Sequence, residues 1–259
     1  MNGSDASISW KTHDSVLIVT IDHQRRRNAL NPEAHQCLAD VFDEFSSDAH
    51  IQVAIITGAG DKAFCSGSDL SVEAGLRRES LPRSGFGGLA ERFDLTKPII
   101  AAVNGDAIGG GLEIVLACDL CVAALNARFA LPEPRVGLAA SGGLHRLMRQ
   151  ISEKHAKELA LTARMFSAED AYRFGLVNIL CEPGLALTRA LSLAQEICKG
   201  APLAVQATKQ MMDQGRGITE LETAFATTYP AFERMINSLD ADEGRRAFLE
   251  KRDPQWRAE

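Results

Sequence analysis

Three consecutive glycines, Gly109 to Gly111, join two apolar stretches in the segment NGDAIGGGLEIVLACDL (104–120). Glycine has a poor helix propensity, so the run needs another reason to stand at the start of a helix. After a strand and before a helix, it lets the backbone approach a neighbour or a ligand closely. The first N–H groups of that helix have no partners within it and lie at the positive end of its dipole. The segment therefore suits close helix–sheet packing, or an oxygen that becomes negative during a reaction.

The spacing of these glycines differs from that of two familiar phosphate-binding loops. A dinucleotide-binding turn has the pattern G-x-G-x-x-G, and a P-loop has G-K-[ST] after its glycines. Neither pattern is present in this segment. The local sequence leaves both interpretations open, close packing and a site built from backbone N–H groups.

Two glutamates can add acid–base chemistry to such a site. Glu113 falls in the first turn of the predicted helix, where a carboxylate complements the dipole or acts as an acid or base. Glu133 lies between Pro132 and Pro134, which exclude a regular helix. It occupies either an exposed turn or the second position of a carboxylate pair. A pair requires a short distance between the two glutamates, which the sequence does not give.

A second tight turn follows a strand-like segment in KAFCSGSDL (62–70). The turn Ser66-Gly67-Ser68-Asp69 can supply another backbone N–H donor. A nucleophilic role for Ser68 is disfavoured because the G-x-S-x-G elbow is absent, with serine at position 66 where the elbow has glycine.

Strands and helices alternate along the first half of the chain, which predicts an α/β core. Short apolar, β-branched runs predict strands at 15–22, 53–58 and 98–105. The pair Asn31-Pro32 predicts the start of a helix with proline in its first position.

Three other segments complete the predicted organisation. Residues 89–96 have a helical pattern that ends before Pro98, and from about residue 186 nearly the whole chain is predicted to be helical. The polar, glycine-rich segment 71–88 is predicted to be mobile and to cover a binding pocket. The length of 259 residues allows one large domain or a core with an appendage.

Composition and charge exclude several classes of function. The formal net charge is −6, and Arg25 to Arg27 have no interleaved aromatic residues, so nucleic-acid and membrane-surface binding are disfavoured. These arginines form either a solvated edge or a phosphate contact. The amino terminus lacks a signal-peptide pattern and no apolar run approaches about 18 residues, so a cytoplasmic location is expected. The six scattered cysteines are expected to be reduced packing residues rather than a zinc site.

Taken together, these segments resemble the crotonase family, also called the enoyl-CoA hydratase/isomerase superfamily. The matching stretches stand in the family's order and cover nearly the whole chain: RRRNALN, VAIITGAGDKAFCSGSDL, KPIIAAVNGDAIGGGLEIVLACDL, ARFALPEPRVGL, GGLHRL, SAEDAYRFGLVN and EGRRAFLEKRDPQW. SGFGGLAERFDLTKP and FALPEPRVGL are most similar to its crotonobetainyl-CoA hydratase (carnitinyl-CoA dehydratase) branch.

The resemblance implies an α/β fold of the crotonase (ClpP-like) type, a spiral of ββα units with a C-terminal helical region used in trimerisation. Residues 1–197 are then the spiral core with the active site, and residues 198–259 are the helical trimerisation region. The resemblance also implies a homotrimer or a dimer of trimers. It implies an acyl-CoA thioester substrate and no metal or redox cofactor, coenzyme A being part of the substrate.

The resemblance further assigns roles to individual residues. The backbone N–H groups of Ser68 and Gly110 would form an oxyanion hole for the thioester oxygen. Glu113 would activate water and Glu133 would protonate the α-carbon, two roles that need opposite protonation states. The positions expected to contact coenzyme A are Arg25, Arg26, Arg27, Ala29, Ser66, Asp69, Leu70, Phe248 and Lys251. The three arginines would lie near its phosphates, and the last two residues often come from a neighbouring subunit.

Two features depart from the family's pattern. Ser68 replaces the common alanine, which keeps the backbone donor but adds a hydroxyl near the thioester. The usual Pro-Gly-Ala-Gly-Gly loop is replaced by Ala139-Ala140-Ser141-Gly142-Gly143 and is one residue short. This loop is expected beside Glu133, so its change bears on acyl specificity and on the placing of that carboxylate.

The glutamate pair favours reversible hydration of a trans-2-enoyl-CoA to a 3-hydroxyacyl-CoA. A carnitinyl-CoA dehydratase-type hydro-lyase is an alternative. An enoyl-CoA isomerase is another, which would use Glu133 and leave Glu113 idle. Outside the enzymes, the chain could be a catalytically silent relative that binds acyl-CoA or RNA. The presence of both glutamates argues against that interpretation.

Overall fold

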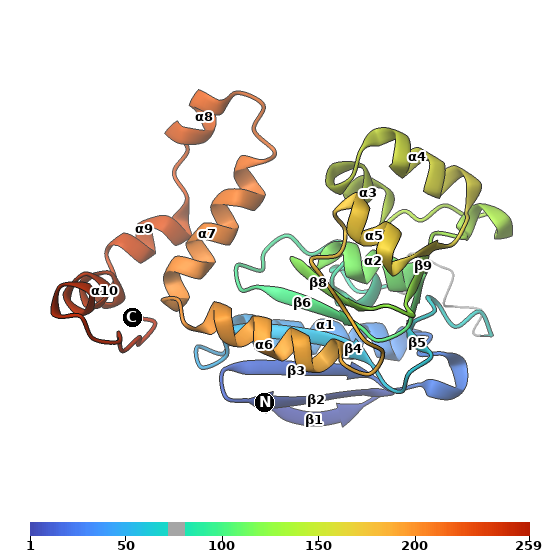
Figure 1. Cartoon of the computed structure of the whole chain (residues 1–259), viewed down its shortest axis with the longest axis horizontal. Coiled ribbons are helices and arrows are strands. Elements are labelled where there is room, and N and C mark those ends of the chain that lie inside the picture. The colour runs from blue at the N-terminus through green and yellow to red at the C-terminus, as the bar shows by residue number, and fades with distance from the viewer. Residues whose placement is uncertain (72–80) are drawn as a thin grey trace.

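Runs of apolar and β-branched residues form a seven-stranded sheet in the computed structural model, which describes residues 1–71 and 81–259 (Figure 1). In spatial order the strands are β1 (Asn2–Asp5), β2 (Ile8–His13), β3 (Val16–Ile21), β4 (Val53–Gly58), β6 (Ile99–Val103), β8 (Leu120–Ala124) and β11 (Ile179–Cys181). The pairs β1–β2 and β2–β3 are antiparallel, and the pairs from β3 to β11 are parallel. The strands predicted at 15–22, 53–58 and 98–105 are β3, β4 and β6.

A second, four-stranded sheet contains the strands that follow β4, β6 and β8 along the chain. Its spatial order is β10 (Phe166–Ser167), β9 (Arg128–Ala130), β7 (Asp106–Ile108) and β5 (Ala63–Cys65). The chain passes from β4 to β5, from β6 to β7 and from β8 to β9, and a helix follows β7 directly. This succession is the ββα repeat that the resemblance implies, and it confirms the predicted α/β class.

The first helix begins where its local capping signal predicts. Asn31 precedes the first helix, and its side chain accepts the N–H of Ala34 at 2.9 Å. The helices are α1 (Pro32–Ser47), α2 (Gly110–Ala117), α3 (Leu144–Gln150), α4 (Glu153–Thr162), α5 (Ala168–Phe174), α6 (Ala186–Cys198), α7 (Pro202–Gly215), α8 (Leu221–Ala226), α9 (Pro230–Ile236) and α10 (Leu239–Glu250). Short 3-10 turns include η1 (Gln24–Arg26), η4 (Phe86–Gly88) and η5 (Glu133–Val136).

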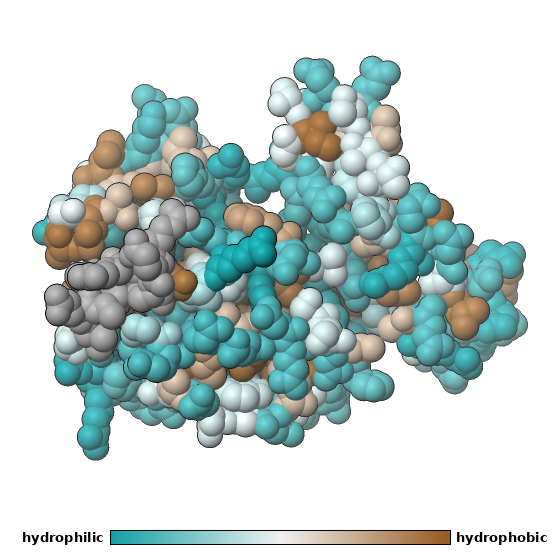
Figure 2. Space-filling model, turned by 180° about the vertical axis from the view of Figure 1, so that it is seen from behind, coloured by the Kyte–Doolittle hydropathy of each residue, from teal (hydrophilic) through white to brown (hydrophobic). Residues whose placement is uncertain are grey.

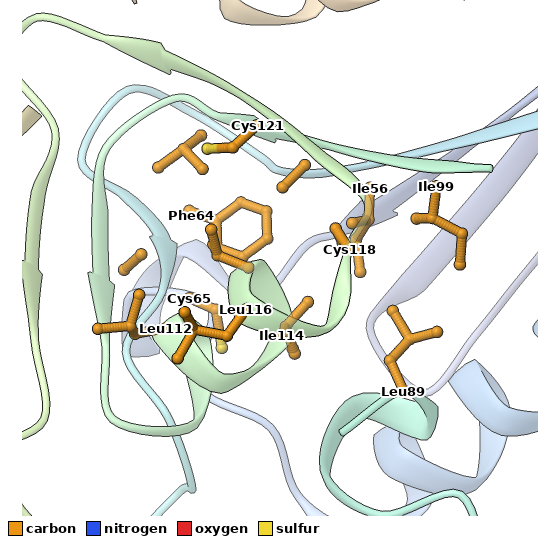
Figure 3. Close-up of a cluster of buried hydrophobic side chains, with 14 of the residues drawn as sticks. Ile56, Phe64, Cys65, Leu89, Ile99, Leu112, Ile114, Leu116, Cys118 and Cys121 are labelled. Carbon is orange, nitrogen blue, oxygen red and sulfur yellow. The ribbon is translucent and has the colours of Figure 1, made fainter. Parts of the chain in front are cut away.

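Both faces of the seven-stranded sheet are covered, because successive residues of its strands point to opposite sides. Ile56 faces the larger core with α1, α2 and the four-stranded sheet, and Ile55 faces α6 around Ala190. Figure 3 shows α2 within the larger core, with Leu112 and Leu116 among apolar side chains. Burial of its apolar residues holds α2 firmly in the molecule.

The helix predicted at 89–96 is wrong. After η4 the chain forms a turn and then continues without regular structure to residue 96. The guanidinium of Arg146 donates to the carbonyl oxygens of Ala90 and Arg92 at 3.1 and 3.3 Å. A distant cation thus takes carbonyl groups that a local helix would need.

The prediction of mobility for residues 71–88 is wrong at the end of that segment. Residues 72–80 lie outside the described residues, so the prediction is untested there. In η4, however, Phe86, Gly87 and Gly88 are buried between α1 and α2. The glycines in this stretch serve close packing rather than freedom of motion.

The helices α7 to α10 form an arm that extends away from the sheets (Figure 1). Large apolar side chains are exposed along this arm, among them Leu221, Phe225, Phe248 and Leu249. Figure 2 shows scattered hydrophobic residues among polar ones on it. A cleft of about 1600 Å³ separates α7 from the region of α2 and α3.

Candidate active site

The glycine run brings the start of α2 into direct contact with two other segments. A Cβ atom on Gly110 would lie 2.2 Å from the ring of Phe86, and one on Gly111 would lie 2.0 Å from the carbonyl oxygen of Cys65. Any side chain at either position would push α2 away from η4 or from β5. The packing interpretation of the glycines is therefore correct for these two positions.

The turn after β5 lies against the same helix start. Gly67 has a φ of +93°, and a Cβ atom on it would lie 3.4 Å from the backbone nitrogen of Gly110. Leu30 donates its N–H to the oxygen of Gly67 and accepts the N–H of Asp69, both at 2.9 Å. In this parallel bridge the N–H of Ser68 points away from Leu30. The structure thus places the turn that carries the Ser68 N–H beside the Gly110 N–H.

Glu113 is buried in the first turn of α2, with 6% of the residue exposed. Its Oε1 accepts the N–H of Gly142 at 2.9 Å. Burial, and to a smaller extent the charge of Glu133, raise its pKa to about 7, against the opposing effect of hydrogen bonds from Gly142 and Gly143. A carboxylate in this environment can exchange a proton near neutral pH.

Glu133 turns its carboxylate inward although the residues that follow it are exposed. A Cβ atom on Gly109, the residue before α2, would lie 2.9 Å from Oε1 of Glu133. Its Oε2 is buried and has no hydrogen-bond partner within the described part of the chain. Burial raises the pKa of Glu133. The exposed-turn interpretation of Glu133 is thus wrong for its side chain.

The two carboxyl groups therefore share one site at the N-terminus of α2. Repulsion by the charge of Glu133 raises the pKa of Glu113. Simultaneous ionisation of the two carboxyl groups is disfavoured, because burial penalises both charges and the charge of Glu133 acts on Glu113. Such a pair can hold one proton and pass another, as acid–base catalysis requires.

The loop at 139–143 contacts Glu113, and the residue before it contacts Glu133, the neighbour that was expected. Its direct contact with a catalytic candidate is the bond from the Gly142 N–H to Glu113. The nearby Leu138 N–H bonds the backbone oxygen of Glu133 at 2.9 Å. Gly142 was not predicted as a partner of Glu113, although the adjacent pair Gly142-Gly143 is a sequence signal for a close approach.

The two segments expected to hold coenzyme A lie side by side. The N–H of Ser66 donates to the oxygen of Arg27 and its Oγ donates to the oxygen of Arg26, both at 3.2 Å. Ala29 is buried between them, and Leu70 is exposed. Asp69 is buried and accepts bonds from the N–H and Oγ of Ser71, so its carboxylate stabilises the turn.

The three arginines differ in their surroundings. The guanidinium of Arg27 lies 3.6 Å from Asp106, which also accepts two bonds from Arg128. Arg25 and Arg26 are exposed, and among the described residues neither has a carboxylate within ion-pair distance. Arg25 and Arg26 are therefore available to an anion, while Arg27 is partly neutralised.

Phe248 and Lys251 lie far from this site in the same chain. Phe248 is an exposed residue of α10, and Lys251 follows that helix directly. Figure 1 places α10 at the opposite end of the molecule from β5. One chain alone does not bring these two residues to the loops at 25–30 and 66–70.

Within the described ranges, the cysteines form no disulfide and the potential metal ligands form no metal site. The cysteines are all unpaired thiols, and five of the six are buried. Within residues 1–71 and 81–259, no group of three or more histidines, cysteines or acidic residues is arranged to hold a metal ion. No helix in these ranges is both long and apolar enough to cross a membrane.

Comparison with known proteins places this site in a family context. Residues 11–259 match the family model described as enoyl-CoA hydratase/isomerase. A carnitinyl-CoA dehydratase from Salmonella arizonae is 39% identical in an alignment that covers 97% of this chain and 98% of that protein.

Solved structures are similar over the whole length. An enoyl-CoA hydratase from Mycobacterium tuberculosis H37Rv is 42% identical with a TM-score of 0.92, covering 98% of this chain and 100% of the other. A carnitinyl-CoA hydratase from Mycobacterium avium is 38% identical with a TM-score of 0.78, covering 99% and 100%.

Proposed function

This chain belongs to the enoyl-CoA hydratase/isomerase family, and from that premise we propose that it is a hydro-lyase acting on a CoA thioester. The reaction is reversible addition of water to a trans-2-enoyl-CoA, which yields a 3-hydroxyacyl-CoA. The observation that carries the proposal is the meeting of Glu113 and Glu133 at the helix start beside the Ser68 turn.

The oxyanion hole consists of the backbone N–H groups of Ser68 and Gly110. They donate to the thioester oxygen, and their bonds strengthen as the enolate-like transition state places negative charge on it. Each donor contributes on the order of 3 kcal/mol in comparable sites. The close approach of Gly67 to the Gly110 nitrogen supports this placement of the two donors.

The glutamates supply the proton transfers. In the reacting state the one proton that the pair shares is on Glu133. Ionised Glu113 then takes a proton from water as the water oxygen bonds the β-carbon, and neutral Glu133 gives its proton to the α-carbon. The carbon–carbon double bond supplies the electron pair for the new C–H bond. Addition of water leaves no net oxidation or reduction for a redox cofactor to accept, and we propose none beyond the coenzyme A of the substrate.

The coenzyme A moiety lies along the adjacent segments 25–30 and 66–70, with Arg25 and Arg26 toward its phosphates. Phe248 and Lys251 contribute from a neighbouring subunit of a homotrimer or a dimer of trimers. The exposed apolar side chains of the arm support this assembly. We assign residues 198–259 to trimerisation and residues 1–197 to the core. Unpaired cysteines suit a reducing compartment such as the cytoplasm.

A second candidate function is a carnitinyl-CoA dehydratase-type hydro-lyase, which has the same chemistry on a different acyl group. Relatives that are 37–39% identical over 97% of this chain are named carnitinyl-CoA dehydratase. The experiment that tests the proposal therefore uses a panel of substrates: crotonyl-CoA, longer enoyl-CoAs and crotonobetainyl-CoA.

The test measures hydration of this panel by the wild type, Glu113→Gln and Glu133→Gln, with exposed Glu44→Gln on α1 as the matched control. Each site variant is expected to lose at least about a hundredfold in kcat, and the control to lose nothing. Absence of hydration by the wild type, or full activity in either site variant, would refute the proposal. Conversion of a 3-enoyl-CoA without water addition would indicate an isomerase, and tight binding without turnover would indicate a silent relative.

A further inference from the structure

A wholly buried histidine outside the proposed acid–base pair lies close to the oxyanion hole. His35 on α1 is 0% exposed, and burial lowers its pKa to about 4, so the ring is neutral at physiological pH. Its Nδ1 accepts the N–H of Gly87 at 3.1 Å. The proton of the neutral ring is therefore on Nε2, which is buried without a partner in the described ranges.

This arrangement costs stability that an apolar residue would not cost. A buried N–H without an acceptor is unfavourable. A leucine at position 35 would fill similar space without that penalty. What the imidazole supplies, and leucine cannot, is the acceptor for the Gly87 N–H.

The turn whose Gly87 N–H His35 accepts is η4, and its backbone has conformations that favour glycine. Gly85, Gly87 and Gly88 all have positive φ angles, of +77°, +61° and +68°. Glycine adopts these angles readily, and the His35 hydrogen bond and the packing on α1 and α2 then fix the position of the turn. A Cβ atom on Gly87 would lie 2.6 Å from the side chain of Ile114, which shows how closely the turn is pressed onto α2.

Phe86 connects this turn to the oxyanion donor. Its ring stands edge-on to the His35 ring, with centroids 4.4 Å apart and planes at 66°. The same ring covers Gly110, where an added Cβ atom would lie 2.2–2.6 Å from three ring atoms. Displacement of Phe86 would thus free the helix start to move.

We propose that His35 is a positioning residue for the oxyanion hole: by accepting the Gly87 N–H it fixes η4, and η4 holds the Gly110 N–H in place through Phe86. The inference rests on the proposed function, in which Gly110 is an oxyanion donor. His35 touches no substrate and takes no part in proton transfer.

The experiment compares two nearly isosteric variants. In His35→Asn the side-chain oxygen occupies the place of Nδ1 and can accept the Gly87 N–H, whereas His35→Leu has no acceptor. On the enoyl-CoA that the wild type hydrates best, we expect kcat to fall about tenfold in His35→Leu, with KM within twofold. His35→Asn should keep at least half of the wild-type kcat, and the pH profile should not change in either variant.

Three results would overturn the proposal: wild-type kcat in His35→Leu, an equal loss in His35→Asn, or a loss confined to KM. If His35→Leu does not fold, His35→Gln replaces it, because its amide reaches the place of Nε2 rather than Nδ1. Equal kcat for His35→Gln and His35→Asn then refutes the idea.

Hydrogen exchange provides a measurement that is independent of catalysis. Amides of the peptide covering residues 104–117 should exchange faster in His35→Leu than in the wild type and His35→Asn. Equal exchange in both variants counts against the positioning role even if the wild type hydrates no enoyl-CoA, an outcome that refutes only the proposed function.

Discussion

The carboxylate of Glu133 reaches Gly109 so closely that a Cβ atom on that glycine would lie 2.9 Å from its Oε1. Gly109 also has a φ of +57°, which disfavours side chains. Glycine at this position thus has two functions, to let the chain turn into α2 and to leave room for the second carboxylate of the site.

The Gly109→Ala variant is predicted to lose activity. The new methyl group would displace the Glu133 carboxylate, because a contact of 2.9 Å is too short for a Cβ atom. We expect kcat for hydration to fall at least about tenfold. Steady-state kinetics against Gly217→Ala, whose Cβ would meet only a 3.4 Å contact, provide the comparison. Equal activity of the two variants would show that Glu133 does not need its present place.

Glu113→Gln is predicted to stabilise the protein at high pH while it removes activity. Folding raises the pKa of Glu113 from its ordinary 4.5 to about 7, so the native state binds more protons than the unfolded state between those values. Stability from this group is present below about pH 4.5 and is lost as pH rises through about 7.

The glutamine variant does not titrate and keeps an acceptor for the Gly142 N–H. The free energy of unfolding of Glu113→Gln should therefore exceed that of the wild type by on the order of 2–3 kcal/mol at pH 8, and by little at pH 4.5. Urea unfolding at both pH values, at one protein concentration, measures this difference. A difference that does not change with pH would contradict the raised pKa.

The hydration rate is predicted to fall on the acid side of about pH 7. Glu113 must be ionised to take a proton from water, and its pKa is about 7, so kcat/KM should drop about tenfold per pH unit below that value. Glu91→Gln should move this limb to lower pH, because the charge of Glu91 raises the pKa of Glu113. Profiles between pH 4 and 9 test both points, and a limb near pH 4.5 in the wild type would exclude Glu113 as the base.

The arginines after β3 are predicted to contribute unequally to binding of coenzyme A. Arg26→Ala should raise the KM of a CoA thioester about three- to tenfold with kcat unchanged, because this exposed guanidinium is available to a phosphate. Arg27→Ala should have a smaller effect, since Asp106 already lies 3.6 Å from Arg27. A pantetheine thioester lacks the nucleotide phosphates, so Arg26→Ala should not change its KM. An equal rise for both thioesters would argue against a phosphate contact.

Local sequence patterns predicted the elements whose causes are local. The β-branched runs at 53–58 and 98–105 became β4 and β6, and Asn31 caps α1 as predicted. The helix predicted at 89–96 failed because Arg146, more than fifty residues away, takes the carbonyls of Ala90 and Arg92. Propensity and capping act within about a turn of helix, so they do not register such a partner.

The sequence by itself indicated the residues that we propose carry the chemistry, and the resemblance of its motifs to a known family pointed to the reaction. Only the tertiary structure decided that Glu113 and Glu133 share one buried site, that Gly142 holds Glu113, and that the three glycines meet three different neighbours. The raised pKa values have the same origin. Each of these properties depends on segments distant in the chain packing together and excluding water, which the order of residues along the chain does not express.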